Sequence, residues 1–106
     1  MNIQHLLKQA QKVQQDVQKL QEELAQRSFE GTAGGGAVTA TCTGDHRFES
    51  LKISPDLIKE AANDTSLLED LILSAVQQAI DASKETSERE MKKLTGGMGL
   101  PPGMGF

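Results

Sequence analysis

The stretch that decides the fold is Gly34–Thr43, which reads GGGAVTATCT. After the three glycines, apolar residues alternate with threonines, so that Val38, Ala40 and Cys42 fall on one side. A period of two is typical of a strand with one buried face. We therefore expect Ala37–Thr43 to form a strand that another element covers on one side only.

The segments on either side of this stretch predict two more strands. Ser28–Ala33 is short and extended before the glycines, and Gly44–His46 has the composition of a turn. Arg47–Ser54 alternates as well, but Phe48 is out of phase with Leu51. A β-bulge between these two residues would bring both side chains onto one face. The sequence thus predicts a three-stranded antiparallel meander.

The segment before the sheet predicts one long helix from Ile3 to about Arg27, because it is rich in Gln, Lys, Leu and Glu and contains no Gly or Pro. Its apolar residues follow one another in alternating steps of three and four, which is the seam of a coiled coil. A lone helix of this kind is marginal in water, so the seam must meet a surface of the same chain or of a partner. The seam consists of Ile3, Leu6, Ala10, Val13, Val17, Leu20 and Leu24.

Two helices are expected after the sheet. Ser54–Asp56 provides a cap, a proline and an acid for a short helix that ends near Asn63. Ser66–Glu69 has the spacing of a capping box and opens a long helix that stops at Gly96–Gly97. The long helix carries an apolar stripe that is broader than a heptad seam and suits packing on a sheet: Leu68, Leu71, Ile72, Ala75, Val76, Ala79 and Ile80.

The predicted fold class is therefore α/β of the α+β kind: a long N-terminal helix, a three-stranded antiparallel sheet, a short helix and a long C-terminal helix. We expect one domain over residues 1–95 and a flexible Gly/Pro/Met-rich tail over residues 96–106.

The composition limits both stability and location. The chain has 106 residues, one cysteine, three phenylalanines and neither Trp nor Tyr. A disulfide within the chain is impossible, and a domain this small buries little surface, so burial against a second copy is the expected source of further stability. A single Cys without a secretory signal or a long apolar run indicates a cytoplasmic protein that does not enter a membrane.

The net charge of −4 does not favour nucleic acid, so a DNA-binding hypothesis depends on where the charges lie. Lys8, Lys12 and Lys19 fall in a narrow arc opposite the seam of the first helix, and no acid precedes Asp16. This face could follow a phosphate backbone, with Lys as point charges and Gln as hydrogen-bond donors. Periodicity alone favours the other interpretation, an ordinary solvated helix face.

A second cationic cluster lies at the end of the long helix. Arg89, Lys92 and Lys93 are three and four residues apart and could bind phosphates. Cations at a helix C-terminus also complement the helix dipole, and Glu85, Glu88 and Glu90 are close enough in sequence to pair with them.

No constellation of residues predicts catalysis. Gly31–Gly36 has the glycine spacing of a phosphate-binding loop, but Ala37 and Val38 stand where its Lys and Ser/Thr are required. Cys42 lies on the apolar side of its strand and is expected in the core, whereas His46 in the turn is expected to face solvent. The sequence indicates no enzyme, no catalytic residue, no cofactor and no metal site.

Five stretches in order nevertheless resemble the YbaB/EbfC family over almost the whole chain. They are LKQAQK at 7–12, EGTAGGGAV at 30–38, LKISPDL at 51–57, LEDLI at 68–72, and KLTGG at 93–97 followed by Leu100 and Pro101.

The resemblance implies a YbaB-like, tweezer-shaped homodimer that binds double-stranded DNA with little sequence specificity. It implies a nucleoid-associated protein with roles in nucleoid organisation and gene regulation. Because family members are thought to contact DNA with the first and the long helices, the implied DNA-binding residues are Lys8, Lys12, Lys19, Lys92 and Lys93. One departure is that many relatives begin with a Gly/Met-rich tail, whereas here the helix starts almost at once.

Two alternatives lack DNA binding: a protein-interaction adaptor and a prefoldin-like chaperone subunit. The order helix, β-hairpin, helix also describes prefoldin subunits, in which both terminal helices carry heptads and pair along their length. Here only the first helix has a strict seam, which disfavours the chaperone.

Overall fold

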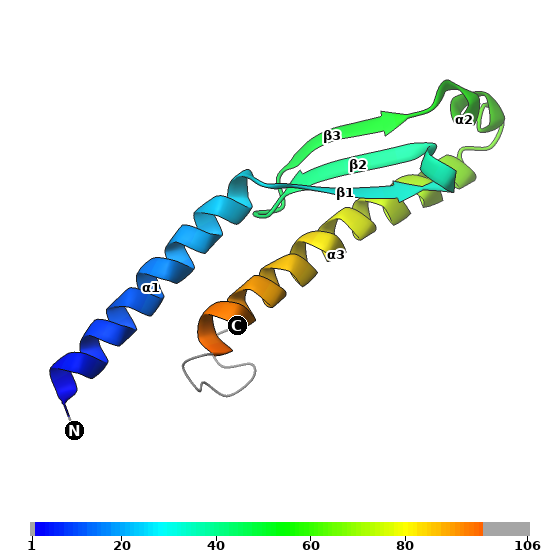
Figure 1. Cartoon of the computed structure of the whole chain (residues 1–106). Coiled ribbons are helices and arrows are strands. Elements are labelled where there is room, and N and C mark those ends of the chain that lie inside the picture. Colours follow the sequence, from blue (N-terminus) through cyan, green and yellow to red (C-terminus); the bar gives the residue numbers. More distant parts are fainter. Residues whose placement is uncertain (1, 97–106) are drawn as a thin grey trace.

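The computed structural model describes residues 2–96 and confirms the predicted fold class and order of elements (Figure 1). Its elements are α1 (Ile3–Gln26), β1 (Ser28–Ala33), the 3-10 turn η1 (Gly34–Gly36), β2 (Val38–Thr43), β3 (Phe48–Ile53), α2 (Pro55–Glu60) and α3 (Ser66–Gly96). Within residues 2–96, none of the helices combines the length and the apolar composition needed to cross a membrane.

The sheet has the order β1-β2-β3 with antiparallel neighbours, as the meander predicts. Val38, Ala40 and Cys42 are completely buried, and α3 runs along the side of the sheet on which they lie (Figure 1). The strand begins one residue later than expected, because Ala37 has helical dihedral angles at the end of the glycine turn. The alternation of apolar residues in GGGAVTATCT thus correctly predicted which face of β2 is buried.

The β-bulge between β2 and β3 is confirmed. Thr41 pairs with Ser50, but Cys42 pairs with Phe48, so Glu49 is the additional residue of β3. Because paired residues of neighbouring strands point to the same face, the bulge puts Phe48 on the side of Cys42. Leu51, opposite Ala40, lies on that side as well.

The long helix approaches β1 so closely that only small residues fit between them. A Cβ atom built on Gly31 would lie 2.1 Å from the carbonyl oxygen of Ala75 and 2.5 Å from the amide nitrogen of Ala79. Both alanines are completely buried. The broad apolar stripe of α3 thus packs on the sheet as predicted, with its smallest residues at the point of closest approach.

The predicted end of α2 was wrong, and so was the capping box predicted at the start of α3, although α3 does begin at Ser66. The helix α2 ends at Glu60 rather than near Asn63, because Ala61 already leaves the helical region with ψ 2°. Ser66 does not cap α3 but is its first residue: its N–H donates to the Asp64 carboxylate at 3.0 Å. The hydroxyl of Thr65 donates to the Glu69 carboxylate at 2.9 Å, so the polar contacts at this helix start come from residues that precede Ser66.

At the other end, α3 is described as far as Gly96, the first residue of the glycine pair at which the sequence predicts its end. The flexible tail predicted for residues 96–106 otherwise falls on residues 97–106, which lie outside the described part of the chain.

The contact of α3 with β1 yields a stability prediction for Gly31→Ala. The added methyl group meets backbone atoms that cannot move independently, so we expect the free energy of unfolding to fall by about 2–3 kcal/mol. Urea denaturation followed by circular dichroism measures the change. Gly35→Asn is the control, because Gly35 has φ 67°, which Asn tolerates, and open space around it. Equal stability of Gly31→Ala and wild type would contradict the close approach.

Candidate nucleic-acid interface

The helix α1 leaves the sheet as an arm beside the C-terminal half of α3 (Figure 1). The molecule is accordingly long and narrow, with extents of 71 × 23 × 16 Å. Leu24, at the base of the arm, is buried in the core, and Leu20 packs against that core. Ile3 and Leu6, by contrast, are 69% and 47% exposed. Among the residues that the structure describes, the seam of α1 is therefore covered near the sheet and uncovered toward its N-terminal end.

The turn between β2 and β3 holds the base of this arm. The N–H of Gly44 donates to the carbonyl oxygen of Leu24 at 2.8 Å, and a Cβ on Gly44 would lie 2.2 Å from the same oxygen. From the other side, the Ser83 hydroxyl of α3 donates to the Gly44 carbonyl at 3.4 Å. One glycine of the turn thus links the two long helices.

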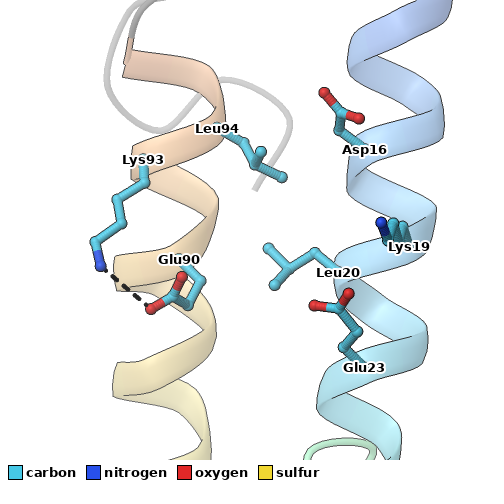
Figure 2. A pocket seen from close by; sticks show the side chains of 7 residues that line it. All are labelled: Asp16, Lys19, Leu20, Glu23, Glu90, Lys93 and Leu94. Carbon is cyan, nitrogen blue, oxygen red and sulfur yellow. Dashed lines mark hydrogen bonds and ion pairs between the residues drawn. The ribbon is translucent and has the colours of Figure 1, made fainter.

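Between the two helices lies a hollow of about 300 Å³ (Figure 2). Leu20 of α1 and Leu94 of α3 point toward each other across it. Three carboxylates and two lysines complete the lining, and Lys93 donates to Glu90 at 3.4 Å. The lining residues are Asp16, Lys19, Leu20, Glu23, Glu90, Lys93 and Leu94. A hollow with more carboxylates than lysines does not favour a phosphate group.

The carboxylates that line the hollow lower the expected contribution of Lys19 and Lys93 to phosphate binding. Lys19 stands three residues after Asp16 and four before Glu23, so carboxylates flank it on its own helix. The predicted pairing of the second cluster with its glutamates is confirmed for Lys93. The spacing of Asp16 and Glu23 around Lys19 is visible in the sequence and is the signal that separates Lys19 from Lys8 and Lys12.

The other three candidate lysines have no ion-pair partner among residues 2–96. Lys8 and Lys12 are exposed on the outer part of α1, where no acid occurs, and within residues 2–96 neither takes part in an ion pair. Lys92 is exposed as well, whereas Arg89 donates to the Thr86 hydroxyl at 3.2 Å. The structure therefore places Lys19 and Lys93 on facing helices that line the hollow and leaves Lys8 and Lys12 farther out on the arm.

Two arginines near the base of the arm were not singled out from the sequence. The Arg27 guanidinium lies over the Phe29 ring, 5.4 Å from its centroid. Arg47 pairs with the Asp45 carboxylate at 3.1 Å. The Thr43 hydroxyl, which donates to Asp45, and then the Arg47 guanidinium hold the pKa of that carboxyl below its usual range. Arg47 is thus already partly neutralised within its own turn.

The residues considered for catalysis occupy the predicted positions. Cys42 is completely buried, and burial raises the pKa of its thiol, with a further contribution from the Glu49 carboxylate. His46 is exposed in the turn with φ 62°. Residues 2–96 bring no group of three His, Cys, Asp or Glu side chains into an arrangement that could hold a metal ion.

Fold and arm together define a class: a small helix–sheet–helix protein whose first helix is a lysine-bearing arm. The model of the YbaB/EbfC DNA-binding family matches residues 1–98, and the chain belongs to this family.

Individual relatives agree with this assignment. A nucleoid-associated protein of Clostridium novyi is 48% identical over 101 residues, which cover 95% of this chain and 87% of the relative. A nucleoid-associated protein of Neisseria meningitidis is 48% identical over 100 residues, with 94% and 88% coverage. The crystal structure of an uncharacterized protein from Helicobacter pylori superimposes with a TM-score of 0.68 at 20% identity, over 92% of this chain and 97% of that one. The last comparison confirms the fold.

The base of the arm yields a second prediction, for Leu24→Ala. Removing this buried side chain leaves a cavity where α1 meets the core, so we expect the free energy of unfolding to fall by about 2–4 kcal/mol. Urea denaturation measures the loss. Leu7→Ala is the matched control on the same helix, because Leu7 is 58% exposed and its truncation should cost less than about 0.5 kcal/mol. Equal losses in both variants would show that α1 is not anchored at Leu24.

Proposed function

We propose that this protein is a nucleoid-associated protein that binds duplex DNA through the outer part of α1, as a homodimer and with little sequence specificity. The observation that carries the proposal is the coincidence of Lys8 and Lys12 with the acid-free, projecting part of the arm. Membership of a DNA-binding family and the names of its relatives support the same function.

Low sequence specificity follows from the kinds of side chain that the arm presents. From Asn2 to Gln15 its polar residues are mostly lysine and glutamine, and no arginine or aromatic residue occurs. Lysine meets phosphates as a point charge, whereas arginine is the commonest reader of guanine edges. Binding should therefore come mainly from phosphate contacts and weaken steeply with salt.

The open part of the sheet supports the homodimer. The helix α3 packs mainly under β1 and β2, so residues 2–96 leave the corresponding face of β3 without a cover. Phe48 and Leu51, which lie on that face, are 46% and 48% exposed. Adjacent apolar side chains on an uncovered sheet face are typical of an association surface, and a second copy would supply the burial that so small a chain lacks.

Binding of this kind would act on DNA architecture rather than on a chemical reaction. A dimer carries two arms and hence two sets of lysines, so it can hold one duplex at two places. Contributions to nucleoid organisation and to gene regulation, at the nucleoid in the cytoplasm, would follow from changes in the path of DNA.

The geometry gives less support to the two alternatives. In a prefoldin-like subunit the terminal helices would pair along their length, but here the first half of α3 packs on the sheet and only its C-terminal half runs beside α1. An adaptor without DNA binding would leave the acid-free part of the arm without a role.

The DNA hypothesis predicts a strong effect of the double variant Lys8→Glu/Lys12→Glu. Reversing both charges removes phosphate contacts from each arm, so we expect at least about a tenfold loss of affinity and a shallower salt dependence. Fluorescence anisotropy with a labelled random-sequence duplex, at low and near-physiological salt, measures both. Lys19→Glu should have a smaller effect, because carboxylates already flank Lys19.

Lys59→Glu is the control for net charge, because Lys59 is exposed on α2 at the opposite end of the molecule. An equal loss of affinity in this control would mean that overall charge, not the arm, governs binding. Failure of the wild type to bind DNA at low salt would overturn the proposal.

The homodimer hypothesis predicts that Leu51→Glu is a monomer at concentrations where the wild type is a dimer. A charge on the uncovered face of β3 would have to be buried without a partner, which is costly. Sedimentation velocity measures the mass, and circular dichroism checks that the variant is folded. A wild type that sediments as a monomer at tens of micromolar, or a dimeric Leu51→Glu variant, would contradict this interface.

A further inference from the structure

The outer half of the α1 seam has no cover among the described residues. Leu94, two residues before the last described residue of α3, lines the hollow together with Asp16 and Leu20, so the described part of α3 reaches the middle of α1. The eleven residues 3–13 extend about 16 Å beyond that level. Ile3 and Leu6 are largely exposed there, although they continue the seam that is covered at Leu20 and Leu24. A helix of this length gains little stability in water without a packing partner.

The residues of the uncovered seam have the same spacing when they are counted from either end. Its four residues, Ile3, Leu6, Ala10 and Val13, follow one another in steps of three, four and three. An antiparallel copy of the same helix therefore sets Ile3 opposite Val13 and Leu6 opposite Ala10. A large side chain then faces a small one at the centre, which allows the two helices to approach closely.

The charges of the arm permit this contact. On a helical wheel, Lys8 and Lys12 fall roughly opposite the seam, so in an antiparallel pair they point away from the partner helix. The polar residues that flank the seam, Gln9 and Gln14, are uncharged. Two arms can thus meet along the seam without opposing like charges, and their lysines stay available on the outside.

We propose that the outer seams of α1 from two molecules pack against each other as a short antiparallel pair, which links one dimer to another. The occupant is a second copy of this chain, because the seam is complementary to its own reverse and its flanks are neutral. Antiparallel packing also keeps the two bodies at opposite ends of the contact. The role of the contact rests on the proposed function: dimers joined at their arms, each holding DNA on its lysine face, would bridge two duplexes.

Sedimentation velocity of the full chain without DNA tests the contact itself. We expect the wild type to show a concentration-dependent step from dimer to tetramer between about 10 and 200 µM, because the buried surface is small. Leu6→Gln should abolish this step and leave the dimer intact. Leu67→Gln is the matched control, since Leu67 is 49% exposed against 47% for Leu6 but lies in the first turn of α3.

A wild type that shows no species above the dimer at 200 µM, or a Leu6→Gln variant that associates like the control, would overturn the proposal. The outer seam would then have another occupant, in this chain or in a different protein. The mass step removed by Leu6→Gln is separate from the one removed by Leu51→Glu, so the two interfaces cannot be confused.

Cysteine cross-linking tests the orientation, in a Cys42→Ser background. An equal mixture of Leu6→Cys and Ala10→Cys proteins should form a mixed disulfide under mild oxidation, because positions 6 and 10 face each other only in the antiparallel pair. Leu6→Cys protein that links to itself faster than the mixture would indicate parallel arms and overturn the proposal.

The DNA readouts keep this inference apart from the proposed function. Leu6→Gln should bind a labelled duplex like the wild type, because its lysines are unchanged, yet fail to capture a second duplex on beads that carry the first. If the wild type bound no DNA, the proposed function would fail while sedimentation still decided the arm contact. If Leu6→Gln captured the second duplex as well as the wild type, bridging through the arms would be wrong.

Discussion

The close approach of α3 to β1 at Gly31 is the contact on which the rest of the structure depends. Because no side chain separates the strand from the backbone at Ala75 and Ala79, the axis of α3 is held under β1 and β2 and not under the whole sheet. Two consequences follow. The inner face of β3 stays open, with Phe48 and Leu51 half exposed, and α3 continues past the sheet to meet α1. The proposed dimer surface and the arm thus both result from where one glycine places one helix.

The packing and the charge of the arm both change near Asp16, which divides the arm into two halves. From Asp16 onward its seam is covered by α3 and the core, and three carboxylates line the same hollow as Lys19. Before Asp16 the described residues leave its seam uncovered, and Lys8 and Lys12 are the only charged side chains. An acidic protein can therefore present a cationic surface, because exposed charges more than about 8 Å from a phosphate are largely screened at physiological salt, so the nearest charges on the arm decide the local attraction.

Much of the fold could be predicted from the spacing of apolar residues, because this spacing indicates which face of a strand or helix is buried. The alternation around Val38 predicted the covered face of β2. The phase change between Phe48 and Leu51 predicted the bulge in β3 without reference to the partner strand. The errors lay at helix ends near Asn63 and Ser66. Several polar residues compete there for the same free N–H groups, and small differences in backbone geometry decide which of them binds.

The sequence by itself determined the elements, their order, the buried face of the sheet and the five candidate lysines, because these depend on residue periodicity and type. Only the tertiary structure decided which half of the α1 seam is covered and which lysines have carboxylate neighbours. Glu90 and Lys93 come beside Asp16 and Lys19 across more than 70 residues of chain. Such neighbours depend on the length and direction of α3 after it leaves the sheet, and a periodic pattern within one helix contains no information about either.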